Sequence, residues 1–233
     1  MPDRGGSVFA LLAAAGMGQR LGIDRPKAFA ALAGRPLLAE SLDRLDRCPW
    51  VDAIVVAAPP GWEEPAILLA EELAAVKVVA CVPGGATRAE SVRAALAEVP
   101  DEALVVLVHD AARPLLADEV VERVLGRLVE GYDGAVPVLP LADTVKRVEA
   151  GVVRETVSRE GLVAAQTPQA FLLPALRRAF AGGDVAGATD CASLVERAGG
   201  RVAVVDGDPR LLKVTTRADL ALVETLLAGG SGR

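Results

Sequence analysis

The fold is decided by the stretch VFALLAAAGMGQRLG at residues 8–22. Its first eight residues, Val8–Ala15, are apolar without alternation, as in a strand that is covered on both faces. Glycines follow directly at positions 16, 18 and 22, and glycine lets the backbone turn sharply and approach a phosphate closely. The stretch therefore predicts the first strand and the ligand-binding turn of an open α/β sheet.

Apolar runs of strand length recur along the rest of the chain, and helical patterns separate them. The expected strands are Val8–Ala15, Val51–Ala58, Val76–Val82, Leu104–Val108, Ala135–Leu139 and Val202–Val205, and the expected helices are Leu37–Leu45, Glu63–Ala75, Arg88–Ala97, Glu119–Val129, Ala192–Ala198 and Ala218–Leu227. The capping box Thr87-x-x-Glu90 and the candidate N-caps Asp118 and Thr216 mark helix starts. This alternation predicts an α/β fold with a Rossmann-like, doubly wound, mostly parallel sheet, in a single domain over residues 1–233.

One segment departs from this alternation. Residues Asp143–Arg159 are charged and rich in Val and Thr, and Ala150-Gly151 lies near their middle. Two strand-like runs around such a turn are typical of a hairpin. We expect a β-arm at about residues 141–160 that leaves the sheet, with an exposed hairpin of no particular role as the alternative.

Composition excludes several classes of protein. Lysine and arginine total 25 and aspartate and glutamate total 31, so the formal charge is −6, whereas nucleic-acid-binding proteins are typically basic. No apolar stretch reaches the 18 or so residues of a membrane span. Cys48, Cys81 and Cys191 are far apart and form no zinc-ligand pattern, which favours a reduced compartment. We therefore expect a cytoplasmic protein without a nucleic-acid or membrane partner.

The glycine-rich turn differs from two common phosphate-binding motifs. The dinucleotide fingerprint needs its third glycine one place before Gly22 and an acidic residue after the second strand, which here ends in Pro59-Pro60. A Walker A loop needs Gly-Lys-Ser/Thr, which does not follow. Arg20 and Lys27 do follow, and such cations neutralise charge in triphosphate chemistry. The turn predicts a nucleoside-triphosphate site, with two solvated surface charges as the alternative.

Other candidate residues follow later strands. Gly84-Gly85 and Ser91 surround a capped helix start and could bind the edge of a base. Asp110 follows the fourth strand at the sheet edge where ligands of open α/β sheets bind, and it is a candidate for Mg²⁺ or a hydroxylated substrate. The single histidine, His109, is expected to be structural. The remaining candidates are dispersed: Arg113, Thr144, Lys146, Arg159, Thr167, Thr189, Asp190 and Lys213.

Taken together, these blocks resemble the 2-C-methyl-D-erythritol 4-phosphate cytidylyltransferase family of the non-mevalonate isoprenoid pathway. They occur in the family's order over nearly the whole chain. The first block marks only the wider nucleotidyltransferase superfamily. The blocks that begin at Val108 and Asp143 narrow the resemblance to this family and its close cytidylyltransferase relatives. The blocks are Ala14-Ala15-Gly16-x-Gly18-x-Arg20 with Arg25-Pro26-Lys27, Gly84-Gly85-x-x-Arg88-x-x-Ser91, Val108-His109-Asp110-Ala111-Ala112-Arg113-Pro114, Asp143-Thr144-Val145-Lys146, Thr167-Pro168-Gln169, Thr189-Asp190 and Lys213-Val214-Thr215.

The resemblance implies a Mg²⁺-dependent, homodimeric enzyme in which an oxygen of methylerythritol phosphate attacks the α-phosphorus of CTP and releases pyrophosphate. It implies that Arg20 and Lys27 stabilise the transition state and that Arg159 and Lys213 hold the substrate phosphate. In the family, the arm of the second subunit supplies part of the substrate pocket. The implied nucleotide contacts are Ala14, Ala15, Gly16, Gly18, Gly85, Ser91 and Ala111, and the implied substrate contacts are Asp110, Arg113, Thr144, Thr167 and Thr189.

Two residues depart from the family pattern. Ala86 stands where some members carry an acidic residue that can accept a hydrogen bond from the cytosine amino group, so base selectivity here depends on backbone groups and Ser91. Cys191 stands where an acidic residue is frequent. Three rival hypotheses remain: a cytidylyltransferase for another alditol phosphate such as ribitol 5-phosphate, a non-catalytic nucleotide-binding regulator, and an NAD oxidoreductase.

Overall fold

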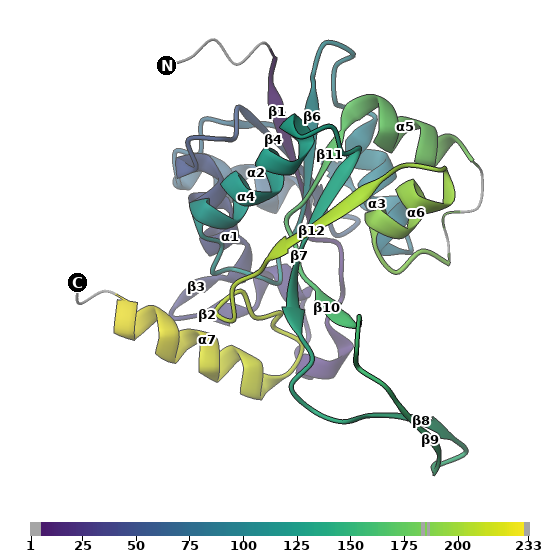
Figure 1. Ribbon diagram of the computed structural model, residues 1–233. Coiled ribbons are helices and arrows are strands. Elements are labelled where there is room, and N and C mark those ends of the chain that lie inside the picture. The colour runs from purple at the N-terminus through teal and green to yellow at the C-terminus, as the bar shows by residue number, and fades with distance from the viewer. Residues whose placement is uncertain (1–5, 183–184, 186, 231–233) are drawn as a thin grey trace.

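Strand β1 (Val8–Ala13) lies inside the central sheet, parallel to β4 (Ala53–Ala58) on one side and to β6 (Val105–Asp110) on the other. The computed structural model describes residues 6–182, 185 and 187–230, and Figure 1 shows the twisted sheet with helices on both sides. Strand β5 (Val78–Pro83) is parallel to β4 and forms the edge of the sheet. All four strands arise from apolar runs that the sequence predicts.

The other half of the sheet mixes strand directions. Strand β11 (Gln169–Leu172) lies between β6 and β7 (Gly134–Pro140) and is antiparallel to both. Strand β12 (Val202–Asp206) is parallel to β7, and β10 (Val163–Ala165) is antiparallel to it. Apart from β10 and β11, the described strands of this sheet run in one direction, which confirms a mostly parallel sheet.

Helices cover both faces of this sheet (Figure 1). In β1, Ala10 and Leu12 face one apolar cluster and Phe9 and Leu11 face the other, because successive side chains of a strand point to opposite faces. Each fully buried leucine side chain contributes about 1.5–3 kcal/mol relative to an exposed one. The first face is covered by α1 (Leu37–Arg47), α2 (Glu63–Glu72) and α4 (Asp118–Val129), and the second by α3 (Arg88–Leu96), α5 (Leu173–Ala181) and α6 (Cys191–Arg197). The predicted doubly wound sheet is thus confirmed.

Three predicted helix starts can be compared with the structure. The capping box before α3 is present: the Glu90 N–H donates to Thr87 Oγ1 at 3.2 Å and the Thr87 N–H donates to Glu90 Oε2 at 2.9 Å. Thr216 likewise stands just before α7 (Arg217–Gly230), and its Oγ1 accepts a hydrogen bond at 3.2 Å from the N–H of Asp219 in the first turn of that helix. The prediction for Asp118 is wrong by one residue, because Ala117 is the N-cap and Asp118 begins α4, where its negative charge still complements the helix dipole.

The predicted β-arm projects away from the sheet, as Figure 1 shows. Its strands β8 (Val145–Glu149) and β9 (Val152–Val157) pair antiparallel in a separate two-stranded sheet. Ala150 and Gly151 both have positive φ, 49° and 78°, as the tight hairpin turn between right-twisted strands requires. Three valines on the arm are more than half exposed: Val148, Val152 and Val153.

A third apolar cluster forms where α7 packs against the segment that follows β1. It joins Leu21, Leu32, Val214 and Val223. The short elements in this region are the 3₁₀ turns η1 (Gln19–Leu21) and η2 (Lys27–Phe29) and the strands β2 (Ala31–Leu32) and β3 (Arg35–Pro36). None of the helices in residues 6–182 and 187–230 is both long and apolar enough to cross a membrane.

Candidate active site

A cleft of about 1050 Å³ opens at the carboxyl ends of β1, β4, β5 and β6. This is the edge of an open α/β sheet at which ligands bind, as the sequence predicts. The glycine-rich segment after β1 forms one wall, the turn at Gly84-Gly85 after β5 forms another, and Asp110 with Lys213 lies between them. Strand ends that are far apart in the sequence therefore meet at one site.

The glycine-rich loop owes its shape to two glycines. Gly18 and Gly22 flank η1 with φ of 67° and 61°, in the left-handed region that favours glycine. A Cβ atom on Gly18 would lie 2.6 Å from Lys27 Cβ, so only glycine lets the loop pack against Lys27. A Cβ atom on Gly16 would contact nothing within 4 Å, and the Gly16 backbone lines the cleft. The loop thus exposes backbone to the cleft, as phosphate binding requires.

Four cations line the cleft: Arg20, Lys27 and Lys213 near this loop, and Arg88 beside Asp110. Arg20 is exposed in η1, and within the described residues its side chain makes no hydrogen bond or ion pair. Lys27 Nζ donates to the carbonyl oxygen of Val214 at 3.2 Å. Burial, and after it the nearby charge of Lys213, lowers the pKa of Lys27. A bound anion would stabilise the charged form of Lys27 against both its burial and its repulsion by Lys213. These neighbouring cations therefore suit a phosphate ligand.

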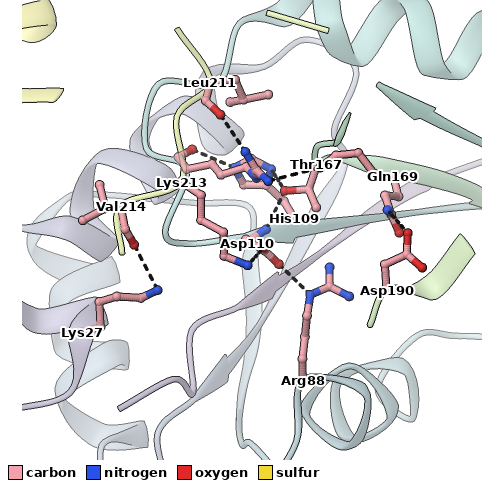
Figure 2. Close-up of polar contacts among 12 residues, drawn as sticks. Lys27, Arg88, His109, Asp110, Thr167, Gln169, Asp190, Leu211, Lys213 and Val214 are labelled. Atoms are coloured by element: carbon pink, nitrogen blue, oxygen red, sulfur yellow. Dashed lines mark hydrogen bonds and ion pairs between the residues drawn. The ribbon is translucent and has the colours of Figure 1, made fainter. Parts of the chain in front are cut away.

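The carboxylate of Asp110 is held between two cations (Figure 2). Arg88 Nε lies 2.7 Å from Asp110 Oδ1, and Lys213 Nζ lies 2.7 Å from Asp110 Oδ2. Burial alone would raise the pKa of Asp110, but the charges and hydrogen bonds of Arg88 and Lys213 outweigh it and hold that pKa well below its usual range. Asp110 is therefore ionised at neutral pH and fixes the position of the Lys213 ammonium group.

The protein side chains in the cleft do not form a metal site by themselves. Asp110 is the only acidic residue among the described residues that line the cleft, and each of its oxygens is already paired with a cation. In the described part of the chain, no three His, Cys, Asp or Glu side chains gather closely enough to hold a metal ion. A divalent ion at this site would need phosphate oxygens as its main ligands.

His109 and Thr167 hold Asp110 from behind rather than lining the cleft. His109 is fully buried, and burial lowers its pKa to about 4, so it is neutral at pH 7. Its Nε2 lies 3.0 Å from the Arg113 carbonyl oxygen, which can only accept, so Nε2 carries the proton and Nδ1 accepts from Thr167 Oγ1 at 3.2 Å. Thr167 Oγ1 in turn accepts from the Asp110 N–H at 3.0 Å. These contacts confirm that His109 is structural.

The turn expected to bind the base is held by Ser91. The Gly85 N–H donates to Ser91 Oγ at 3.1 Å, and that hydroxyl donates to the Thr87 carbonyl oxygen at 2.9 Å. A Cβ atom on Gly84 would lie 2.3 Å from the Cβ of Ala15, so glycine lets this turn contact the segment after β1. Ser91, Gly85 and Ala86 all line the cleft.

The structure brings most, but not all, of the predicted site residues together. Those that line the cleft are Ala14, Ala15, Gly16, Gly18, Arg20, Lys27, Gly85, Ser91, Asp110, Ala111 and Lys213. Those that do not are Arg113, Thr144, Arg159, Thr167 and Thr189. Arg113 donates to the Leu211 carbonyl oxygen at 2.9 Å. Arg159 donates to the carbonyl oxygens of Leu141 and Ala142 at the base of the arm, so one chain alone does not bring it to the cleft.

Sequence reasoning assigned no role to Arg88, although it lines the cleft and pairs with Asp110. A cation at the first residue of a helix opposes the helix dipole, and this conflict was the available sign of a special role. Arg88 also donates to Cys191 Sγ at 3.6 Å. Burial raises the pKa of the Cys191 thiol to about 11, so this second partner of Arg88 is neutral.

Known proteins resemble this chain along nearly its whole length. The family model for 2-C-methyl-D-erythritol 4-phosphate cytidylyltransferase matches residues 8–229. Relatives with that name from Saccharopolyspora erythraea and Nocardia farcinica are 51% and 49% identical; the matches cover 95% and 97% of this chain and 100% and 96% of the relatives.

Solved structures agree with this result. The 2-C-methyl-D-erythritol 4-phosphate cytidylyltransferase of Thermus thermophilus superposes with a TM-score of 0.77 at 36% identity, over 96% of this chain and 98% of that one. The enzyme of the same name from Francisella tularensis gives a TM-score of 0.80 at 28% identity, over 94% and 99%. Four of the seven motif blocks contribute residues to this one cleft, and, by the family model and these relatives, the chain belongs to the 2-C-methyl-D-erythritol 4-phosphate cytidylyltransferase family.

Proposed function

We propose that this protein transfers the cytidylyl group of CTP to 2-C-methyl-D-erythritol 4-phosphate, giving 4-diphosphocytidyl-2-C-methyl-D-erythritol and pyrophosphate. The observation that carries this proposal is the cluster of Arg20, Lys27 and Lys213 beside an open glycine-rich loop in a chain of this family. A pure nucleotide-binding regulator has no need to stabilise a leaving pyrophosphate, so this many cations favour an enzyme. The names of the relatives favour methylerythritol phosphate over ribitol 5-phosphate.

In this proposal the two walls of the cleft bind the two ends of CTP. The loop at Gly16 and Gly18 surrounds the triphosphate with backbone groups, as helix-start and turn amides do for phosphates elsewhere. The turn held by Ser91 surrounds the cytosine. Because Ala86 has no acceptor on its side chain, the cytosine amino group pairs with backbone carbonyls.

The reaction is a displacement at phosphorus. A phosphate oxygen of the alditol substrate forms a bond to the α-phosphorus, and the bond from that phosphorus to the pyrophosphate oxygen breaks. Negative charge grows on the α-phosphoryl oxygens and on the leaving group, and Arg20 and Lys27 stabilise it. Such a nucleophile is already ionised at neutral pH, so no general base is required, in keeping with a buried, neutral His109.

The alditol phosphate binds on the side of Lys213 and Asp110. Lys213 holds its phosphate, and it keeps part of its surface open for this, with 39% of its side chain exposed. A carboxylate oxygen can accept two hydrogen bonds, so each Asp110 oxygen can accept a substrate hydroxyl while it stays paired with its cation.

We propose further that two subunits exchange arms and complete each other's clefts. Thr144 and Arg159 are exposed near the base of the arm, and Val148, Val152 and Val153 are uncovered in the single chain. An isolated two-stranded hairpin is marginally stable in water, so a partner would stabilise it. In the homodimer each arm delivers Arg159 and Thr144 to the substrate phosphate in the neighbouring cleft.

Two further parts of the proposal concern the ion and the compartment. Mg²⁺ enters as the counter-ion of CTP, because it prefers phosphate oxygens and water to a protein cage. Among the described residues that line the cleft, the acidic one, Asp110, already has both oxygens paired with cations. The compartment is the cytoplasm, in keeping with Cys48, Cys81 and Cys191 all being free thiols.

The test is pyrophosphate release with CTP and a panel of alditol phosphates that includes methylerythritol 4-phosphate and ribitol 5-phosphate. We expect the highest kcat/KM with methylerythritol 4-phosphate, and a preference for CTP over UTP measured in the same assay. A higher kcat/KM with ribitol 5-phosphate, or nucleotide binding without turnover on any member of the panel, would overturn the proposed function.

A further inference from the structure

Arg217, the first residue of α7, makes hydrogen bonds to the glycine-rich loop that follows β1. Arg217 Nε donates to the carbonyl oxygen of Leu21 at 3.0 Å, and its Nη2 donates to the carbonyl oxygen of Gly22 at 3.0 Å. Leu21 and Gly22 directly follow Arg20 in the sequence, so the contacts fall on the backbone that carries this cation. None of the motif blocks in the sequence includes Arg217.

Apart from Arg217, the segment that carries Arg20 is held by the buried Leu21 side chain and by the backbone hydrogen bonds of Leu21 and Gly22. η1 is only three residues long, and Gly18 and Gly22 at its two ends can adopt many backbone conformations. The Arg20 side chain has no hydrogen bond or ion pair to any described residue. Its position therefore depends on the backbone of residues 19–22, which is held by burial of Leu21 and by Arg217.

Arg217 is itself held in place at the start of α7. The Asp219 carboxylate accepts hydrogen bonds from the Thr215 N–H at 2.8 Å, the Thr215 hydroxyl at 2.6 Å and the Thr216 N–H at 2.7 Å. These hydrogen bonds, that of the Thr215 hydroxyl above all, lower the pKa of Asp219 to about 2. A cation at the first residue of a helix opposes the helix dipole, so an arginine at position 217 does not stabilise α7. Its two hydrogen bonds to carbonyl oxygens give it a different role.

The same short segment also reaches the other cations of the cleft. Lys213 pairs with Asp110, and the carbonyl oxygen of Val214 accepts from Lys27 Nζ. Residues 213–217 thus contribute Lys213, contact Lys27 directly and reach Arg20 through the loop. One segment therefore contacts the surroundings of all three of these cations.

We propose that Arg217 is a positioning residue: by holding the Leu21 and Gly22 carbonyls, it places Arg20 against the triphosphate. The inference rests on the proposed function through the role assigned to Arg20. Arginine suits this task because its planar guanidinium can donate to two neighbouring carbonyl oxygens at once, which a lysine ammonium group does less well.

The first test compares Arg217→Met with a matched control. Arg123→Met also removes an arginine that donates to a backbone carbonyl, that of Asp206 at 2.8 Å, and Arg123 does not line the cleft. We expect Arg217→Met to lower kcat by about 10- to 100-fold, because small displacements of a catalytic group have effects of that size. Arg217→Lys should lose less, and Arg123→Met should stay within twofold of the wild type. A wild-type kcat in Arg217→Met would overturn the inference.

A double-mutant cycle with Arg20→Ala separates positioning from a general structural role. If Arg217 acts through Arg20, Arg217→Met should change kcat less than twofold once Arg20 is already alanine. An equal fold-loss in both backgrounds would show that Arg217 does not act through Arg20. If instead Arg20→Ala alone left kcat unchanged, the role proposed for Arg20 would be wrong.

The last test needs no turnover. The amides of Leu21 and Gly22 donate to the carbonyl oxygens of Gly18 and Gln19, so their hydrogen exchange reports whether η1 and its flanking residues are held in place. We expect faster exchange in Arg217→Met and unchanged exchange in Arg123→Met, with CTP absent. Unchanged exchange in Arg217→Met would overturn the inference even if the proposed reaction were confirmed.

Discussion

Replacing Asp110 by asparagine should destabilise the folded chain strongly, because the two cations around it would lose their counter-charge. Arg88 and Lys213 each lie 2.7 Å from one Asp110 oxygen, and only 8% of the Asp110 side chain is exposed. Breaking a buried ion pair by removing one partner typically costs about 3–5 kcal/mol. Arg88 and Lys213 keep 21% and 39% of their side chains exposed, so water screens part of this cost and we expect about 3 kcal/mol for Asp110→Asn.

The assay is urea unfolding at pH 7, with thermal unfolding as a second measure. For a chain of 233 residues, about 3 kcal/mol corresponds to a fall in Tm of about 6–12 °C. The matched control is Glu149→Gln, which breaks the exposed ion pair between Glu149 and Arg154 on the arm and should cost less than about 1 kcal/mol. If Asp110→Asn cost no more than Glu149→Gln, Asp110 would not balance the charge of the cleft.

The difference between wild type and Asp110→Asn should also depend on pH in a definite direction. Because the folded protein holds the pKa of Asp110 below its usual range, ionised Asp110 stabilises the fold at any pH above its unfolded pKa of about 4. Below that pH the unfolded chain binds a proton first, and the advantage of the wild type declines. We expect a constant difference between about pH 5 and 8 and a shrinking one toward pH 3. A difference that stayed constant down to pH 3 would refute an ionised Asp110.

Three further predictions concern the reaction. Lys27→Ala and Arg20→Ala should each lower kcat by about 10² to 10³ with a smaller change in KM for CTP, and a kcat within twofold of wild type would contradict their assignment. Excess EDTA should abolish pyrophosphate release and Mg²⁺ should restore it, whereas full turnover in EDTA would exclude Mg·CTP as the substrate. Mixing inactive Lys27→Ala with inactive Arg159→Ala should restore roughly a quarter of wild-type activity, because about half of the re-paired dimers are mixed and each has one intact site of two. No recovery after verified subunit exchange would place Arg159 in its own subunit's cleft.

The sequence predicted the parallel strands well because each contains an apolar run, although only the inner strands such as β1 and β4 bury both faces and β5 and β12 leave Val79 and Val204 exposed. It did not predict β11, whose four residues Gln169–Leu172 are too short and too mixed to stand out. They become a strand because both neighbours, β6 and β7, pair with them. Helix α5 was also missed, although Pro174 lies in its first turn, where a proline costs no hydrogen bond.

The cleft was predictable in outline for a similar reason. Glycines and cations that follow parallel strands must meet at one edge of the sheet, so Gly16, Lys27 and Asp110 could be placed together in advance. The partners of Thr167 could not, because its hydroxyl contacts Asp110 and His109 across nearly 60 positions of sequence. Arg217 reaches Leu21 across an even longer separation, and no local pattern marks such a contact.

The order in which the cleft's parts occur along the chain also has a consequence for biosynthesis. The strands of the central sheet are all complete by Asp206, whereas Lys213, the Val214 carbonyl and Arg217 come after them. Protein chains are made from the N-terminus and their domains begin to fold during synthesis. The sheet can therefore assemble on the ribosome while the glycine-rich loop still lacks its contacts with Arg217. A nascent chain that has already buried the sheet therefore lacks the Lys213–Asp110 ion pair and the Arg217–Leu21 contact until the start of α7 has emerged.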